Sequence, residues 1–408
     1  MTGTPSVDVF GGIRVVELAG WVFAPTAGAM LADWGAEVLK IEHPAGGDGY
    51  RGLVMPGSEG AINYAMHMVN RNKKSVAIDL KSDEGRAVML EVLADADVFL
   101  TNYLPSVLDR LGFSAEVLRA KFPRLVIARA HGYGARGDAA DTPAYDATAF
   151  WARGGIEETL APAGLPEPLP QRGAVGDRYG ATHLAFGIAG ALFRRERTGE
   201  GTIVDVSLLG TALWMVASDV TSALQGAFRQ ASPLGEPRVS LPNPLAANYA
   251  CADNRWLTIC CLQSDKYWED MCSVLQLEHL VADDRFVDAG ARSTNSGALV
   301  ALMEVAFATR ALADWREPLD AARIPWAPFQ NLNELVTDPQ VVANGYLGTL
   351  ELETGESFPL PAGAVQFDEH PANLHPAPDL GEHTDEVLLA LGYEWDQIIA
   401  LKLSGAVL

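Results

Sequence analysis

A carboxylate at the start of an apolar helix is the first candidate for chemistry in this sequence. Asp177 lies within residues 173–180, a stretch with glycine at positions 173, 176 and 180, and the apolar segment that follows runs through Leu192. Such a carboxylate either caps the helix through a side-chain oxygen or is a reactive group held against the positive end of the helix dipole. This segment alone leaves both possibilities open.

The loop after the first predicted strand is a second candidate. Residues 13–18 form the strand and Pro25 suits the first turn of a helix, so Trp21, Val22 and Phe23 fall between the two elements. Open α/β sheets bind ligands at the carboxyl ends of their strands, which is where this loop lies. The alternative is that Trp21 and Phe23 belong to the core.

A short basic run is the third candidate. Residues 70–75 contain Arg71, Lys73 and Lys74 just ahead of a predicted strand, in a chain that is otherwise strongly acidic. Clustered cations are suited to binding phosphate groups. A solvated surface loop is the alternative interpretation of the same residues.

Charge and missing motifs exclude several classes of function. The net charge of −22 repels phosphate backbones and anionic membrane surfaces, so we expect no nucleic-acid partner and no membrane association. The chain has no GxGxxG after its first strand and no GxxxxGK[ST], HExxH or GxSxG, which removes the usual support for nucleotide-binding, zinc-protease and hydrolase functions. Residues 1–10 do not resemble a signal peptide, so we expect a cytoplasmic protein.

The cysteines do not predict a metal or redox site. Cys251, Cys260, Cys261 and Cys272 lack the CxxC spacing of zinc sites and thioredoxin-like motifs. We expect reduced, buried, structural thiols, with the adjacent Cys260 and Cys261 pointing to opposite faces of a strand.

Alternating strands and helices near the N-terminus predict an α/β fold. Helical patterns cover residues 25–33 and 83–93, and apolar strand patterns cover residues 13–18, 37–41, 75–80, 97–100 and 125–130. This alternation is typical of a mostly parallel, Rossmann-like sheet with helices on both faces.

Prolines and glycines in residues 230–245 break regular structure and mark a domain boundary. Beyond them we predict a smaller α/β domain with a hairpin turning at Asp253 and Asn254, and helices at residues 265–275, 297–308 and 312–322, the last restarted at Pro318. A second hairpin spans residues 347–360, and a last helix lies near Asp385. We therefore assign residues 1–225 to a large domain, 226–335 to a small domain and 336–408 to a segment that returns to the large domain.

Segments spread along the chain resemble one enzyme family. They comprise residues 12–15, 35–42, 70–75, 97–98, 102–103, 108–110, 176–177, 180, 187–192, 198–201, 204–208, 284–286, 324–328 and 381–384. In their order and spacing they resemble the class III CoA-transferases, also called the carnitine dehydratase and bile-acid-inducible group, which include formyl-CoA transferase and α-methylacyl-CoA racemase. The resemblance covers almost the whole chain.

The resemblance implies a large domain built from both chain ends, a smaller domain in the middle and an interlocked homodimer. It also implies that CoA binds to the large domain as a substrate, that the second substrate is a free carboxylic acid, and that neither a metal ion nor a redox cofactor is needed. The positions matching the family's CoA site and active centre are Trp21, Val22, Phe23, His43, Lys73, Lys74, Ile78, Asn102, Tyr103, Arg110, Tyr145 and Asp146.

By the same resemblance, Asp177 is the acyl-accepting carboxylate. Its attack on a thioester gives a mixed anhydride and CoA thiolate, and the thiolate returns to form an enzyme-CoA thioester that the incoming acid attacks in turn. Each tetrahedral intermediate needs N–H donors, which we expect from the backbone following Gly176.

Two departures from relatives bear on specificity. The racemases carry a His-Asp pair where this chain has Tyr145 and Asp146, and tyrosine, with an ordinary pKa of about 10, is a poor base at neutral pH. Transfer is therefore favoured, with racemisation, a CoA-linked lyase or dehydratase, and a non-catalytic CoA-binding protein as alternatives. Formyl-CoA transferase has glutamine at the position of Val22 and a glycine-rich lid where this chain has Pro233. A larger apolar acyl group therefore fits better than oxalate or formate.

Overall fold

The computed structural model describes residues 8–53, 62–233 and 241–408. Two compact units make up the chain: Met1–Ala231 with Pro339–Leu408, and Ser232–Asp338. The first unit thus contains both chain ends. Residues 234–240 of the predicted linker lie outside the described part of the chain.

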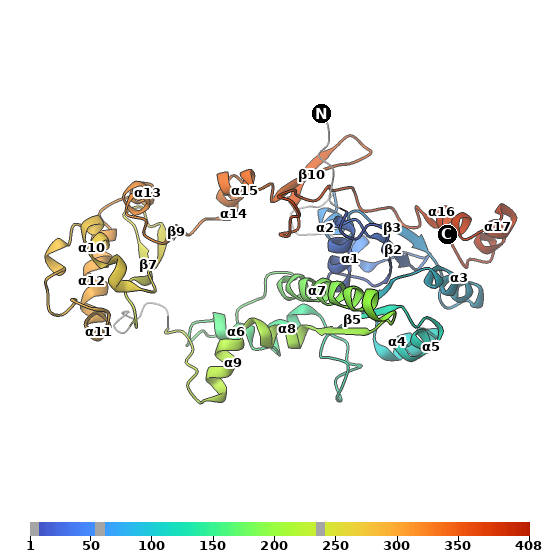
Figure 1. Ribbon diagram of the computed structural model, residues 1–408, viewed down its shortest axis with the longest axis horizontal. Helices are drawn as coiled ribbons and strands as arrows, with labels where there is room; N and C mark the ends of the chain where they lie inside the picture. Colours follow the sequence, from blue (N-terminus) through green and yellow to red (C-terminus); the bar gives the residue numbers. More distant parts are fainter. Residues whose placement is uncertain (1–7, 54–61, 234–240) are drawn as a thin grey trace. The chain divides into compact units, whose positions relative to one another are not determined.

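A six-stranded parallel sheet forms the centre of the first unit (Figure 1). Its order is β3-β2-β1-β4-β5-β6, and every neighbouring pair is parallel. The order reverses between β1 and β4, which is where sheets of this kind bind ligands. This confirms the predicted α/β fold. The strands are β1 (Arg14–Leu18), β2 (Glu37–Glu42), β3 (Lys74–Ala77), β4 (Val98–Thr101), β5 (Val126–His131) and β6 (Ile203–Ser207).

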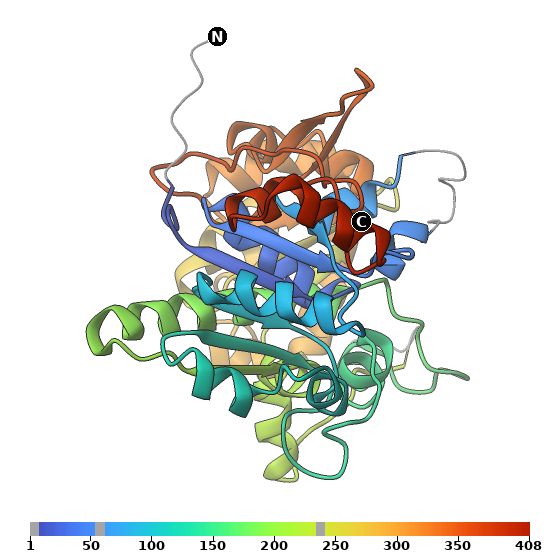
Figure 2. The same cartoon turned by 90° about the vertical axis from the view of Figure 1, so that its right-hand side faces the viewer.

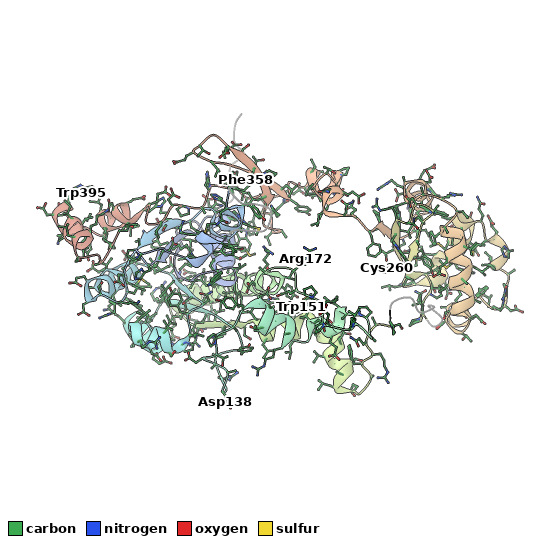
Figure 3. All side chains as sticks on the ribbon, turned by 180° about the vertical axis from the view of Figure 1, so that it is seen from behind. Asp138, Trp151, Arg172, Cys260, Phe358 and Trp395 are labelled. Carbon is green, nitrogen blue, oxygen red and sulfur yellow. The ribbon has the colours of Figure 1, made fainter. Side chains whose placement is uncertain are left out.

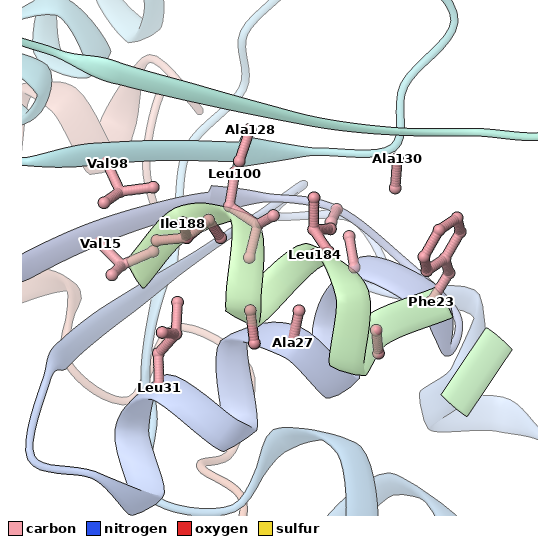
Figure 4. Close-up of a cluster of buried hydrophobic side chains, with 14 of the residues drawn as sticks. Val15, Phe23, Ala27, Leu31, Val98, Leu100, Ala128, Ala130, Leu184 and Ile188 are labelled. Carbon is pink, nitrogen blue, oxygen red and sulfur yellow. The ribbon is translucent and has the colours of Figure 1, made fainter. Parts of the chain in front are cut away.

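Helices cover both faces of the sheet because successive strand residues point to opposite sides. Val15, Leu100 and Ala128 face α1 (Phe23–Asp33) and α7 (Val175–Thr198), as Figure 4 shows. Val16 and Phe99 face the other layer. That layer consists of α3 (Asp83–Ala94), α4 (Pro105–Leu111), α5 (Ala115–Lys121), α16 (Thr384–Ala390) and α17 (Trp395–Leu403).

The remaining elements of the first unit surround this core. They are the short helix η1 (Gly49–Gly52), α2 (Tyr64–Asn70), the π-helix η2 (Ala147–Ala152), α6 (Ile156–Leu160), α8 (Leu208–Met215), α9 (Ala217–Leu224), α15 (Pro339–Ala343) and the antiparallel hairpin of β10 (Leu347–Glu351) and β11 (Ser357–Pro361).

The C-terminal segment packs beside β3 (Figure 2). Ile78 forms a β-bridge with Val407, and the amide of Ala77 donates to the Thr384 hydroxyl at 3.0 Å. β3 therefore ends at Ala77 and not at residue 80 as predicted, since the chain beyond it pairs with the C-terminus. The sequence analysis also missed α17.

The second unit combines a three-stranded antiparallel sheet with helices. The predicted hairpin at Asp253 is confirmed by β7 and β8, but α13 runs through Pro318 without restarting. The elements are β7 (Ala246–Ala250), β8 (Trp256–Cys260), β9 (Trp326–Pro328), α10 (Ser264–Leu275), η3 (Glu278–Leu280), α11 (Ala289–Thr294), α12 (Ser296–Phe307), α13 (Leu312–Ala321) and α14 (Leu332–Leu335).

One cysteine departs from expectation. All four thiols are free, and Cys251, Cys261 and Cys272 are buried as predicted. Cys260, labelled in Figure 3, is exposed, because the alternation of β8 turns it away from the core that Cys261 joins.

Candidate active site

The ends of β1 and β4 are tied together at the point where the strand order reverses. The Asn102 side chain accepts a hydrogen bond from the Gly20 amide at 3.1 Å and donates to the Gly20 carbonyl at 2.7 Å. These two hydrogen bonds continue the link between β1 and β4 beyond the last paired residues of the strands. The loop after β1 therefore starts from a fixed position.

Trp21 follows in an unusual backbone conformation. Its φ is 66°, a left-handed value that costs a non-glycine residue about 1 kcal/mol or more. The Asp48 carboxylate accepts the Trp21 amide at 3.0 Å and the Tyr50 amide at 2.9 Å. Asp48 thus holds the backbone of Trp21 and the start of η1 with one oxygen.

A fully buried chain of charges supports Asp48. Its second oxygen lies 2.9 Å from the ammonium of Lys40, which also contacts Glu17 at 3.2 Å, and Lys73 contacts the other Glu17 oxygen at 2.7 Å. Burial lowers the pKa of Lys73 to about 8 although Glu17 opposes it. Burial alone would lower the pKa of Lys40 as well. The attraction of Glu17 and Asp48 outweighs burial there and raises the pKa of Lys40. The two lysines and the two carboxylates of this network thus balance in charge beneath the loop after β1.

Asp177 is the third residue of α7 and does not cap that helix. The cap position is Ala174, with φ 60°, and no side chain at that position caps the helix. The capping role falls to Asp146, whose Oδ2 accepts the amides of Gly176 at 3.0 Å and Asp177 at 3.3 Å. The N-cap alternative for Asp177 is therefore wrong. So is the expectation that the backbone following Gly176 supplies free N–H donors, because Asp146 accepts the Asp177 amide and the Ala174 carbonyl accepts the Arg178 amide at 3.2 Å.

Burial and a neighbouring carboxylate change the protonation of Asp177. Burial in the cavity, followed by repulsion from Asp146, raises its pKa to about 7, although Arg178 acts in the opposite direction. The pair is held close because Gly176 lacks a side chain: a Cβ there would lie 2.2 Å from the Phe150 ring and 2.3 Å from Asp146. Asp177 is thus a poorly solvated carboxyl group that ionises near neutral pH.

A cavity of about 440 Å³ brings Asp177 together with the loop after β1. We call it the Asp177 cavity. The aromatic rings of Trp21, Phe23, Tyr103 and Tyr145 line it, and Trp21 meets Tyr145 edge-to-face at 5.7 Å. Seven of the predicted CoA-site residues share it with Asp177: Trp21, Val22, Phe23, His43, Asn102, Tyr103 and Tyr145.

A second cavity, of about 380 Å³, adjoins the first. The two share lining residues, including His43, Tyr103 and Val107. We call it the Arg110 cavity. Ile78 and Arg110, both predicted, line it together with Lys81 and Arg86. The carboxyl group of Asp177 lines one cavity and three cations line its neighbour, an arrangement suited to a long ligand with anionic groups away from its reacting end.

Comparison with known proteins decides the family. Residues 10–384 match the family described as CoA-transferase family III. The chain belongs to CoA-transferase family III. It is 34% identical to (R)-2-hydroxy-4-methylpentanoate CoA-transferase of Clostridioides difficile, over 97% of this chain and 98% of that protein. It is also 34% identical to cinnamoyl-CoA:phenyllactate CoA-transferase of Clostridium sporogenes, over 97% of each.

A solved structure agrees with this assignment. The crystal structure of a CAIB/BAIF family protein from Brucella suis matches with a TM-score of 0.76 and 27% identity, covering 94% of this chain and 99% of that one. The predicted family and enzyme class are confirmed: the protein is a CoA-transferase, and CoA enters its reaction as part of a substrate.

Lys73 and Lys74 lie outside both cavities of the transferase. Lys73 has no exposed side-chain surface and donates to Glu17, to the Pro25 carbonyl at 2.8 Å and to Asn70 at 3.0 Å. Lys74 is partly exposed and pairs with Glu37 and Glu386. Both border a separate depression beside the C-terminal segment. Their contribution to CoA binding stays a prediction, and the geometry gives Lys73 a structural role.

Sequence reasoning missed Lys81, Arg86 and Asp48 as site residues of the transferase. The two cations lie around the start of α3, where their sequence context is that of ordinary surface charges. The fold brings them beside Arg110. Asp48 lies in the glycine-rich residues 46–49, a turn signal that gave no hint of its bonds to Trp21 and Tyr50.

His131 lies at the end of β5 and lines the Asp177 cavity. Its Nε2 is 2.9 Å from Asp205, which also pairs with Arg129 at 2.8 Å. Burial raises the pKa of Asp205, but the His131 and Arg129 hydrogen bonds outweigh it and hold that pKa at about 2. His131 thus serves as a hydrogen-bond partner of Asp205.

Two further findings concern the chain as described. No group of three or more His, Cys, Asp or Glu side chains within residues 8–53, 62–233 and 241–408 is placed to hold a metal ion. Over the same ranges no single helix is long and apolar enough to cross a membrane, and one bent pair, Ser296–Phe307 with Leu312–Ala321, passes by length and composition alone.

Proposed function

We propose that this CoA-transferase moves CoA from an acyl-CoA donor to a free carboxylic acid by way of covalent intermediates on Asp177. The observation that carries the proposal is the position of this poorly solvated carboxyl group in a cavity that adjoins another lined by three cations. A carboxylate with few stabilising contacts is a better nucleophile than one held by hydrogen bonds, and no described side chain donates to Asp177.

The reaction is four attacks in sequence. An Asp177 oxygen attacks the thioester carbonyl, and the C–S bond breaks to release CoA thiolate. The thiolate attacks the Asp177 carbonyl carbon of the anhydride and expels the first acid. The second acid's carboxylate attacks the resulting aspartyl thioester and releases the thiolate again. Finally the thiolate attacks the acyl carbon of the second anhydride, which frees the new acyl-CoA and the Asp177 carboxylate.

The first turn of α1 is the source of N–H donors that we propose for the tetrahedral oxyanions. The amides of Phe23 and Ala24 have no acceptor within the helix, and no side chain caps α1. Val22 and Phe23 line the cavity with Asp177, and the Phe23 ring packs against Gly180 of α7. These donors take the place of those that Asp146 occupies.

We place the phosphates of CoA in the Arg110 cavity. Arg86 and Arg110 supply charge there, and the pantetheine arm would pass His43 and Tyr103 to reach Asp177. An Arg86→Ala, Arg110→Ala double variant should weaken CoA binding and flatten its salt dependence, because fewer ion pairs are screened. Isothermal titration at several salt concentrations measures this, with Arg194→Ala, an exposed arginine on α7, as the control. Unchanged affinity in the double variant would disprove this placement.

Substitution of Asp177 tests the mechanism. Asp177→Asn should fold and bind CoA while transfer falls by about three orders of magnitude or more, because an amide cannot form the anhydride. Wild type incubated with an acyl-CoA and no acceptor should carry a hydroxylamine-sensitive adduct on the peptide containing Asp177, detected by mass. Asp396→Asn, another first-turn aspartate, is the control. Near-normal transfer by Asp177→Asn, checked for deamidation, would refute the proposal.

We also propose a homodimer, as the family resemblance implies. Phe186 and Phe193, one face of α7, are 77% and 61% exposed in the single chain, and Trp214 of the packed helix α8 is 68% exposed. Exposed apolar side chains of this size are typical of an interface. Light scattering should give twice the 43.6 kDa chain mass, and a stable monomer at working concentration would contradict this.

A further inference from the structure

The walls of the Asp177 cavity are aromatic and apolar near the reacting carboxyl group. Trp21, Phe23 and Tyr145 line it, with Val22 and Leu208 between them. Trp21 and Tyr145 are 41% and 59% exposed, so a large part of each ring is free to contact a ligand. An aromatic ligand gains about 0.5–1.5 kcal/mol per ring pair beyond the area that it buries on such faces, and a branched apolar group gains by buried area alone.

Contacts with η1 hold the Trp21 side of this aromatic wall in place. Tyr50 backs the Trp21 ring at 6.2 Å and is itself buried, and Asp48 fixes the backbone of both residues. A Cβ on Gly49 would lie 3.2 Å from the Trp21 ring, so the indole rests directly on the η1 backbone. A preorganised wall loses little entropy when a ligand binds.

The charges around the cavity disfavour a second anionic group on the acid. Glu42 and Asp48 line it already paired with Arg51 and Lys40, and no lysine or arginine of the described ranges lines it to receive a second carboxylate. Arg178 is the cation that acts to lower the pKa of Asp177. Its guanidinium donates to the carbonyls of Gly173 and Ala174. A second carboxylate would therefore lose its hydration without gaining a cationic partner, which costs several kcal/mol.

We propose that the acids exchanged by this enzyme are monocarboxylic acids with an aromatic or branched apolar side chain, recognised by Trp21 and Tyr145. The inference rests on the proposed transfer through Asp177 and names its substrate class. It excludes dicarboxylic acids, although relatives in the same family are named for oxalate and for succinate with glutarate. Within one family, the lining of this cavity would thus separate the two substrate classes.

Isotope exchange tests the proposal without knowledge of the natural donor. Full-length enzyme is given an acyl-CoA with its own deuterated acid, so that each acid serves as donor and acceptor, and label uptake into the acyl-CoA is followed by mass. The three pairs are 3-phenylpropanoyl-CoA with 3-phenylpropanoate, butanoyl-CoA with butanoate, and glutaryl-CoA with glutarate. We expect kcat/KM for the aryl pair to exceed that for the glutaryl pair by about 100-fold or more, since a lone buried carboxylate costs several kcal/mol.

Variants of the wall complete the test. Trp21→Ala and Tyr145→Leu should each lower aryl exchange by about tenfold and butanoyl exchange by less, because a short chain covers less of each ring. Trp395→Ala, an exposed tryptophan on α17, is the control and should change neither. Faster glutaryl than aryl exchange, or wall variants that leave the aryl-to-butanoyl ratio unchanged, would overturn the substrate class and leave transfer through Asp177 intact. Absence of exchange with all three pairs would overturn both.

Discussion

The protonation of Asp177 makes activity depend on pH in a predictable way. In the proposed mechanism Asp177 must be ionised to attack the thioester, and burial together with Asp146 raises its pKa from 3.8 to about 7. The ionised fraction is then about one tenth at pH 6 and about nine tenths at pH 8, so kcat/KM should rise about tenfold across this interval. A carboxyl group at its ordinary pKa would be fully ionised throughout, and the same profile would be flat.

Asp146→Asn isolates the electrostatic part of this shift. The asparagine carbonyl can still accept the amides of Gly176 and Asp177, while the negative charge is lost. Burial, the larger cause, remains. The acid limb should therefore move to lower pH without reaching the position of an ordinary carboxyl group, and the rise between pH 6 and pH 8 should become shallower.

The assay is initial-rate exchange between an acyl-CoA and its labelled acid, from pH 5.5 to 8.5 at constant ionic strength. The acid's own pKa lies below about 5, so it stays ionised over this range. His43 and His131 also line the cavity, so His43→Asn and His131→Asn serve as controls and should keep the limb in place. A wild-type profile that is flat from pH 6 to pH 8, or one unmoved by Asp146→Asn, would refute the reasoning.

Three further predictions concern stability, each measured by urea unfolding at fixed protein concentration. Lys73→Met should cost about 3–5 kcal/mol because Glu17 loses a buried partner, whereas the adjacent Lys74→Met should cost less than about 1 kcal/mol. Equal effects would contradict the buried network. Gly176→Ala should cost about 2 kcal/mol or more through overlap with the Phe150 ring, whereas Gly173→Ala, in open space, should stay within about 0.5 kcal/mol. Asp177→Asn should stabilise the fold, because the folded state binds the Asp177 proton more tightly than the unfolded state. Wild type therefore loses stability as pH rises from about 4 to 7, and the gain in the variant should approach about 4 kcal/mol at pH 8 and shrink toward pH 4. An equal gain at both ends would contradict this.

Local patterns predicted the fold better than the partners of individual charges. Apolar strands such as residues 125–130 alternate with helices at spacings that a parallel sheet requires, so the layers followed from the sequence. β3 is the instructive exception. Residues 78–80 have the pattern of a strand, but Ile78 pairs with Val407 from the far end of the chain, a contact that no local pattern contains.

The charged residues depend still more on tertiary context. Lys73 and Arg110 look alike in the sequence, yet the fold buries one against Glu17 and leaves the other lining a cavity. Lys81 and Arg86 gave no signal because their neighbours in sequence are ordinary surface residues. A cation's partner is decided by which strands and helices are adjacent, and sequence spacing does not report this.

The relation between Asp146 and Asp177 explains why a carboxylate at a helix start can be reactive. Free amides and the helix dipole would normally stabilise an anion in the first turn of α7 and lower its pKa. Here Asp146, from outside the helix, takes the amides of Gly176 and Asp177, and its charge faces Asp177. Asp177 thus gains repulsion and desolvation at a place where an aspartate usually gains stabilisation. A carboxylate destabilised in its ground state has more to gain by forming a neutral anhydride, so in the proposed mechanism Asp146 is a positioning residue that activates Asp177.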